Sequence, residues 1–162
     1  MVNQARAKQI DISEAVAMYL TIELLRVIES IHNCHVIHAD IKPDNVLFLG
    51  LPELPKITRT ADGKQMIFPP KEAAVRLIDF GRSIDMAMFP PGTTFLAKVA
   101  TSGFDCIEMR IDKPWTLQAD FFGLVGTIHV IIFQEYMKVS FQEPTDIGAD
   151  EGKWWINRKF KR

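Results

Sequence analysis

Polar and charged side chains suited to phosphate chemistry gather in the stretch His38 to Asn45, HADIKPDN. The stretch lies between the apolar runs CHVI and VLFLG, where so polar a turn needs an explanation. Phosphoryl transfer demands mainly positioning and charge stabilisation from a protein. Asp40 can act as the base for an attacking hydroxyl, Lys42 can neutralise the transferred phosphate, and Asn45 can offer Mg²⁺ an amide oxygen. The stretch therefore predicts the catalytic loop of an enzyme that transfers phosphate.

A second acidic site follows another apolar run. Val75 to Asp79, VRLID, is typical of a short buried strand, and it continues into Phe80 and Gly81. Asp79 would supply the second oxygen ligand of a magnesium ion, with Gly81 as structural support. Strand ends hold functional groups rigidly at a cleft, which explains why polar loops adjoin apolar runs. Together the two motifs match H-x-D-x-x-x-x-N followed by D-F-G, the pattern of the protein-kinase active site.

Two further landmarks occur in the order that protein kinases use. Kinases close the activation segment with a Thr, an aromatic residue and Ala-Pro-Glu, and Thr101, Phe104 and Glu108 keep this spacing. Asp120 then opens an apolar run; in kinases this Asp caps the backbone of the catalytic loop, which explains a buried carboxylate here. The resemblance also implies that Glu108 pairs with a C-lobe arginine, the alternative being an ordinary surface acid. His38 is expected to support the catalytic loop by packing and hydrogen bonding.

The resemblance extends to one group of protein kinases. GRSIDMAMFPPGTTFLAKVATSGFDCIEM and KPWTLQADFFG resemble the Bub family of spindle-assembly-checkpoint kinases, and the similarity covers about residues 12–139. It implies a serine/threonine kinase that uses ATP and Mg²⁺ and is found in nucleus and cytoplasm, at kinetochores in mitosis. It further implies chromatin, checkpoint or motor proteins as substrates, with a WD-repeat partner and a kinetochore scaffold bound outside this chain. Some members have lost Asp-Phe-Gly and are called pseudokinases, whereas that motif is intact here.

The elements that must position these residues can be predicted from periodicity. Apolar residues at helical spacing predict a helix over residues 12–33, and the apolar run predicts a second, nearly fully buried helix over 118–135. Short strands are expected at 46–49 and 75–79, paired antiparallel. Between them, 50–74 is polar and aperiodic, which predicts an exposed, mobile insertion or a long hairpin loop. The fold class is α+β: a protein-kinase-like C-lobe, mainly helical, with short β-hairpins at the catalytic cleft.

Residues 1–162 are expected to form a partial protein kinase domain. The sequence opens close to the first large helix of the C-lobe, and no glycine-rich loop or strand lysine precedes that helix. We also expect the last C-lobe helices to be absent. The chain alone would then lack a complete ATP cleft and would be inactive.

Composition and charge bound the remaining functions. An apolar content of 48% over 162 residues is typical of one globular core, and a net charge of -1 argues against a direct nucleic-acid binder. Two cysteines predict no disulfide framework, and the apolar run 121–133 is too short to cross a membrane. A polar loop is expected from Tyr136 to Asp150. The basic tail KWWINRKFKR is either an amphipathic helix or a binding patch, with Trp154 and Trp155 as core anchors or as a partner surface.

Position 39 departs from the usual kinase pattern. Many kinases carry an Arg there that pairs with a phosphorylated activation loop, and Ala39 cannot pair with a phosphate. We therefore expect residues 82–106 to be ordered by their own packing, and Thr101 to bond near Asp40 and Lys42. The segment's large apolar residues are Met86, Met88, Phe89, Phe95, Leu96 and Val99.

Two alternatives to an active protein kinase stay open, and one residue cluster raises the question of a metal. A scaffold of the same checkpoint family could keep the fold with little turnover. A small-molecule phosphotransferase could share H-x-D-x-x-x-x-N, although Lys42 and the stretch from Thr101 to Glu108 favour a protein substrate. The cluster of His32, Cys34, His35 and His38 could suggest zinc, but no second ligand pair exists, and Cys106 is expected to be a small buried hydrophobe.

Overall fold

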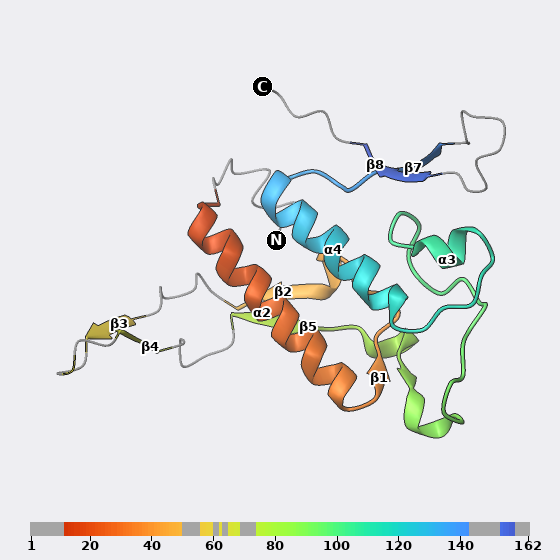
Figure 1. Cartoon of the computed structure of the whole chain (residues 1–162), viewed down its shortest axis with the longest axis horizontal. Helices are drawn as coiled ribbons and strands as arrows, with labels where there is room; N and C mark the ends of the chain where they lie inside the picture. Colours follow the sequence, from red (N-terminus) through yellow and green to blue (C-terminus); the bar gives the residue numbers. More distant parts are fainter. Residues whose placement is uncertain are drawn as a thin grey trace.

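The structure is a computed structural model, and it describes residues 12–49, 56–59, 62, 65–68, 74–142 and 153–157. Two long helices, α2 (Glu14–Asn33) and α4 (Gln118–Phe133), lie side by side at its centre (Figure 1). Both were predicted, and both are confirmed with ends that shift by about two residues. The short strands β2 (Val46–Phe48) and β5 (Val75–Leu77) cross behind α2, and residues 82–106, the activation segment, run around the lower end of the two helices (Figure 1).

Helix α2 is amphipathic, as its sequence pattern requires. Ser13 caps its N-terminus by accepting a hydrogen bond from the Val16 amide at 3.4 Å. Its inward face packs against α4 and the strands β2 and β5 in one apolar cluster. The buried members of that face are Ala17, Leu20, Leu24 and Ile28.

Helix α4 is less buried than predicted. Phe121, Val125 and Ile132 are 50%, 49% and 49% exposed, because they share one helical face that lies outside the apolar core. The opposite face approaches the catalytic loop so closely that a Cβ at Gly123 would lie 2.3 Å from the Ile41 carbonyl oxygen. Only a glycine allows this approach, which sets the helix directly against the loop.

Two short antiparallel pairs hold the loops of the site. β2 (Val46–Phe48) pairs with β5 (Val75–Leu77), with Val46 opposite Leu77, so the predicted pairing is confirmed. β1 (Val36–Ile37) pairs with β6 (Ile84–Asp85). The two strand pairs therefore hold the stretch after β1 close to the stretch after β5, although the two are far apart in the sequence.

The segment between β2 and β5 contains a hairpin of its own. β3 (Lys56–Arg59) pairs antiparallel with β4 (Gln65–Phe68), so these residues form strands where an aperiodic loop was expected. The rest of 50–74 lies almost wholly outside the described residues, so its exposure and mobility stay predictions.

The C-terminal part of the chain differs from the prediction. β7 (Val139–Gln142) replaces the start of the expected polar loop, and β8 (Lys153–Ile156) replaces an amphipathic helix in the tail. Aromatic residues pair well across antiparallel strands, and the rings of Phe141 and Trp154 lie 5.2 Å apart. Trp155 is 51% exposed, so the core-anchor prediction is wrong for it. Residues 143–150 of the expected loop lie outside the described part.

Among the described residues, no helix is long and apolar enough to span a bilayer. The same part of the chain contains no group of three or more metal-ligating side chains, so the His and Cys cluster forms no zinc site there.

A second apolar cluster lies under the activation segment and includes Ile37, Ala39, Met109 and Trp115. The short helix α3 (Ile107–Arg110) and three 3-10 turns complete the fold; the turns are η1 (Pro43–Asn45), η2 (Phe80–Arg82) and η3 (Met86–Met88).

Candidate active site

The backbone of the catalytic loop is fixed by one buried carboxylate on α4. Asp120 is 0% exposed, and it accepts hydrogen bonds from the backbone amides of His38 and Ala39, both at 2.8 Å. Ala39 adopts a left-handed conformation with φ 63°, so the two successive amides converge on the carboxylate. The capping bonds expected of Asp120 are thus present.

A third group on Asp120 was missed by sequence reasoning. His32, in the last turn of α2, places Nε2 2.9 Å from Asp120 Oδ2, and its ring packs edge-on against Phe121. This contact ties α2, α4 and the catalytic loop together. The only signal in the sequence was a histidine at the end of an apolar helix, and this histidine had been considered only as a zinc ligand.

Asp40 lies at the centre of the polar cluster. Its Oδ2 accepts a hydrogen bond from Lys42 Nζ at 2.8 Å, and its Oδ1 accepts one from Thr101 Oγ1 at 2.8 Å. Lys42 Nζ also donates to Thr101 Oγ1 at 2.6 Å, so the three side chains form a closed triangle. The expectation that Thr101 bonds near Asp40 and Lys42 is confirmed.

The triangle keeps Asp40 ionised. Burial alone would raise the pKa of this carboxyl, but hydrogen bonds from Lys42 and Thr101, with the charge of Lys42, hold the pKa below its usual value. A carboxylate that is ionised at neutral pH can accept a proton from a hydroxyl when that hydroxyl begins to form a new bond. The group therefore has the charge state that a base requires.

Asn45 and Asp79 supply oxygen donors at adjoining positions. Asn45 Nδ2 donates to the Asp40 carbonyl at 2.8 Å, which commits the amide nitrogen and leaves the amide oxygen for another partner. Asp79 is exposed just beyond β5, and its neighbour Ile78 donates its amide to the Asn45 carbonyl at 2.9 Å. A carboxylate and an amide oxygen are hard ligands, so this pair fits Mg²⁺.

His38 connects the catalytic loop to the stretch around Asp79. Its Nε2 lies 3.0 Å from the Ile78 carbonyl oxygen, and its ring contacts Phe80 edge-on with centroids 4.8 Å apart. His38 is fully buried, as its expected supporting role requires. Gly81 lies beside the Asp79 carboxylate: a Cβ at this position would be 3.4 Å from Asp79 Oδ1.

The end of the activation segment follows the expected order with one difference. Cys106 is buried, and burial raises the pKa of its thiol to about 11, so it is the inert small hydrophobe that was predicted. Within the described residues Glu108 forms no ion pair with an arginine. Arg110, the nearest arginine in sequence, donates instead to the Asp105 carbonyl at 3.0 Å and lies over the Phe122 ring. The pairing implied for Glu108 is thus not found in this part of the chain.

The activation segment is anchored by backbone contacts as well as by apolar packing. Trp115 Nε1 donates to the Ala97 carbonyl at 2.9 Å, and Phe95 and Trp115 exchange both backbone hydrogen bonds. Phe95 and Val99 pack against the second apolar cluster, as does Met86. The prediction is only partly correct, because three of the named apolar residues point to solvent: Met88, Phe89 and Leu96 are exposed.

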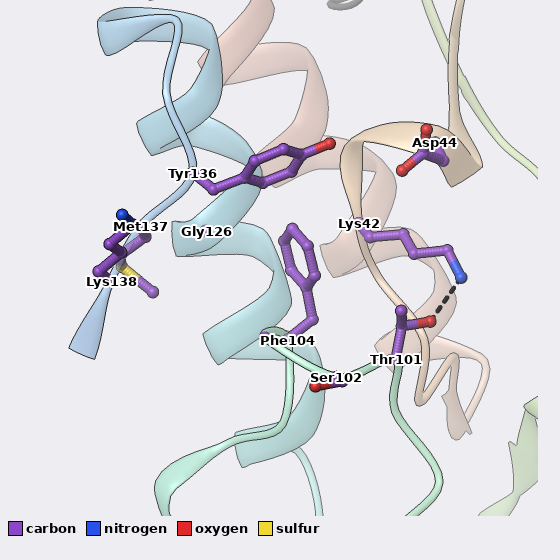
Figure 2. A pocket seen from close by; sticks show the side chains of 10 residues that line it. Lys42, Asp44, Thr101, Ser102, Phe104, Gly126, Tyr136, Met137 and Lys138 are labelled. Atoms are coloured by element: carbon purple, nitrogen blue, oxygen red, sulfur yellow. Dashed lines mark hydrogen bonds between the residues drawn. The ribbon is translucent and has the colours of Figure 1, made fainter. Parts of the chain in front are cut away.

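A pocket of about 630 Å³ opens beside the Asp40 triangle. Figure 2 shows Lys42 and Thr101 at one side of it, joined by their hydrogen bond, and Tyr136 to Lys138 at the other. Phe104 forms an aromatic wall with Tyr136, their ring centroids 6.1 Å apart (Figure 2). Asp44 lies at the rim. A ligand in this pocket would contact Lys42 and Thr101, the two side chains that hydrogen-bond Asp40.

Comparison with known proteins agrees with this geometry. A family model described as the protein kinase domain matches residues 2–150. The chain therefore belongs to the protein kinase family. Its relatives place it more narrowly, in the Bub group of spindle-checkpoint kinases.

The spindle assembly checkpoint serine/threonine-protein kinase BUB1 of Saccharomyces cerevisiae is 36% identical over 171 residues, which cover 100% of this chain and 16% of that protein. The mitotic checkpoint serine/threonine-protein kinase BUB1 of Mus musculus is 42% identical over 126 residues, covering 78% of this chain and 11% of the relative. A crystal structure of the BubR1 kinase domain superposes with a TM-score of 0.69 at 34% identity, covering 98% of this chain and 41% of that one. The chain thus spans a small part of its curated relatives.

Proposed function

We propose that this chain contributes the catalytic loop of a serine/threonine protein kinase that transfers the γ-phosphate of ATP to protein hydroxyls. The observation that carries the proposal is the closed triangle of Asp40, Lys42 and Thr101 around a carboxylate held ionised. The decisive assay supplies the natural protein with radiolabelled ATP and Mg²⁺ and asks whether phosphate reaches serine or threonine of a protein. Transfer that does not depend on Asp40 would refute the proposal.

Each residue of the site has a defined task in this reaction. Asp40 accepts the proton of the substrate hydroxyl, whose oxygen attacks the γ-phosphorus while the bond to the β-phosphate oxygen breaks and ADP leaves. Lys42 neutralises charge on the phosphate that moves. Bound Mg²⁺ supplies charge neutralisation of the ATP phosphates, and Asn45 and Asp79 are the residues that would hold it.

The role of Asp79 can be tested without any turnover. Asp79→Ala is expected to weaken Mg²⁺-dependent ATP binding more than tenfold, since even an outer-shell partner of a metal costs about 10–100-fold in affinity. Isothermal titration of the natural protein with ATP, in Mg²⁺ and in EDTA, measures this. The two proteins should bind ATP alike in EDTA. An equal loss in both solutions would mean that Asp79 acts on the fold or on the nucleotide, not through the metal.

The pocket supports a polypeptide substrate. It begins at Lys42 and Thr101, which both hydrogen-bond Asp40, so a chain whose hydroxyl lies at Asp40 can place a neighbouring residue against the aromatic wall of Phe104 and Tyr136. A small phosphate acceptor would need no contact as far away as Lys138. The pocket therefore favours a protein acceptor over the small-molecule alternative.

Tyr136→Ala tests this assignment of the pocket. We expect KM for a protein substrate to rise roughly fivefold, because one aromatic contact contributes about 1 kcal/mol, while KM for ATP stays unchanged. Steady-state kinetics of the natural protein provide both constants. Phe141→Ala is the matched control, since this aromatic residue is also exposed but does not line the pocket. Equal effects of the two substitutions, or a change in KM for ATP alone, would remove the pocket from the protein-substrate path.

The kinase relatives are named for the mitotic checkpoint. On that basis we assign the natural protein to checkpoint signalling at kinetochores, in the nucleus and cytoplasm, with chromatin, checkpoint or motor proteins as substrates. A WD-repeat partner and a kinetochore scaffold would bind outside residues 1–162. Fluorescent tagging of the protein in mitotic cells tests this, and a tagged protein that never reaches kinetochores would contradict it.

A further inference from the structure

Position 39 cannot supply a cation to the activation segment, and the structure shows what takes its place in the fold. Ala39 is 1% exposed and lies in the apolar cluster beneath the segment. Val99 and Ala100 pack against the same cluster from above. The side chain at position 39 thus contributes an apolar contact where a guanidinium would need a buried anion.

A guanidinium nevertheless lies beside the catalytic carboxylate. It belongs to Arg82, the residue that follows Gly81 at the end of η2. Its Nη1 is 3.6 Å from Asp40 Oδ1, and the same nitrogen donates a hydrogen bond to the Val99 carbonyl. The Arg82 side chain therefore links Asp40 to Val99 near the other end of the activation segment, although it is 49% exposed.

The contacts of Arg82 and Thr101 meet on one oxygen atom. Asp40 Oδ1 accepts from the Thr101 amide at 3.1 Å and from Thr101 Oγ1 at 2.8 Å. Val99, which Arg82 holds, lies two residues before Thr101 in the chain. Fixing the Val99 carbonyl thus limits how far Thr101 can move from the base.

We propose that Arg82 is a positioning residue that holds residues 99–101 over Asp40 and provides the cation that position 39 lacks. The effect of Arg82 on catalysis rests on the proposed kinase function, whereas its role in holding residues 99–101 does not. An arginine suits the task because its guanidinium can donate a hydrogen bond to a carbonyl while its permanent charge lies beside a carboxylate. The segment is then anchored without a phosphate group.

Hydrogen exchange of the natural protein tests the structural content. In Arg82→Ala the amides of residues 99–101 should exchange about tenfold faster, because the segment opens more often. Arg82→Lys should restore part of the protection, since a single ammonium can replace one donor. Lys98→Ala is the matched control: Lys98 is a neighbouring cation whose ion pair, to Asp112 at 3.2 Å, lies on the surface away from Asp40. In Lys98→Ala we expect the exchange rates of the amides of residues 99–101 to change less than twofold.

Two results would overturn the inference. One is unchanged exchange of residues 99–101 in Arg82→Ala. The other is wild-type protection that disappears on phosphatase treatment while Arg82→Ala leaves it intact, since a phosphate would then be the anchor. If Arg82→Ala fails to fold, the comparison between Arg82→Lys and Lys98→Ala decides: faster exchange in the first alone supports the inference, and equal exchange overturns it.

Kinetics separate this inference from the proposed function. With ATP and a protein substrate, Arg82→Ala should lower kcat at least fivefold and leave KM for ATP unchanged, and Arg82→Lys should recover part of kcat. A natural protein without any transfer, but with the expected exchange pattern, would refute the kinase proposal and leave Arg82 as the anchor. Normal kcat in Arg82→Ala would instead refute the positioning role while the kinase proposal stands.

Discussion

Replacing Asp40 by Asn should reduce phosphate transfer to the background rate, a loss of about 10²–10⁴-fold in kcat. The amide keeps the size of the side chain but cannot accept the proton of the attacking hydroxyl. ATP binding should remain largely intact, because the proposed metal ligands are Asn45 and Asp79 and not Asp40. Single-turnover transfer of labelled phosphate measures the chemical step, and titration with ATP and Mg²⁺ measures binding.

Asp112→Asn is the control for this substitution. It makes the same chemical change at a carboxylate that is 79% exposed and pairs with Lys98 on the surface. We expect less than twofold loss of transfer. Full activity in Asp40→Asn would mean that any transfer measured comes from another site, and parallel loss of ATP binding would mean that Asp40 shapes the nucleotide site instead.

The sequence was most informative where chemistry and local structure coincide. The loop that carries Asp40 was recognised because each of its polar residues has a separate task and its flanks are apolar. Asp120 could be assigned because a carboxylate at the start of an apolar helix is stable only with hydrogen-bond partners. Both inferences need little more than the order of residues along the chain.

Other features depend on contacts between distant segments, and the sequence could not supply them. Periodicity showed that 118–135 is apolar, but not that the core buries only one side of α4, so that Phe121 stays half-exposed beside His32. The strand β8 forms because β7 is available to pair with it, and neither strand has a strong pattern alone. Arg82 looked like an ordinary residue after Gly81, since its value lies in the distance to Asp40 and Val99.

Asp120→Ala should cost about 3–5 kcal/mol of unfolding free energy, the amount typical of removing one member of a buried charged network. The substitution leaves the buried amides of His38 and Ala39 without an acceptor, and each such orphan costs about 1–3 kcal/mol. It also releases His32, which joins α2 to α4 through this carboxylate. Urea denaturation followed by circular dichroism gives the change in midpoint and slope.

Two further substitutions locate the cause of this loss. Asp120→Asn keeps the shape and one acceptor oxygen, but its amide nitrogen faces a backbone donor, so we expect an intermediate loss of about 1–3 kcal/mol. Gln118→Ala, one half-turn earlier on the same helix, removes an exposed acceptor of the Thr116 amide and should cost less than about 1 kcal/mol. If Asp120→Ala were no more costly than Gln118→Ala, the catalytic loop would hold its conformation without the carboxylate. The hydrogen bonds of Asp120 would then follow from the loop's shape and would not determine it.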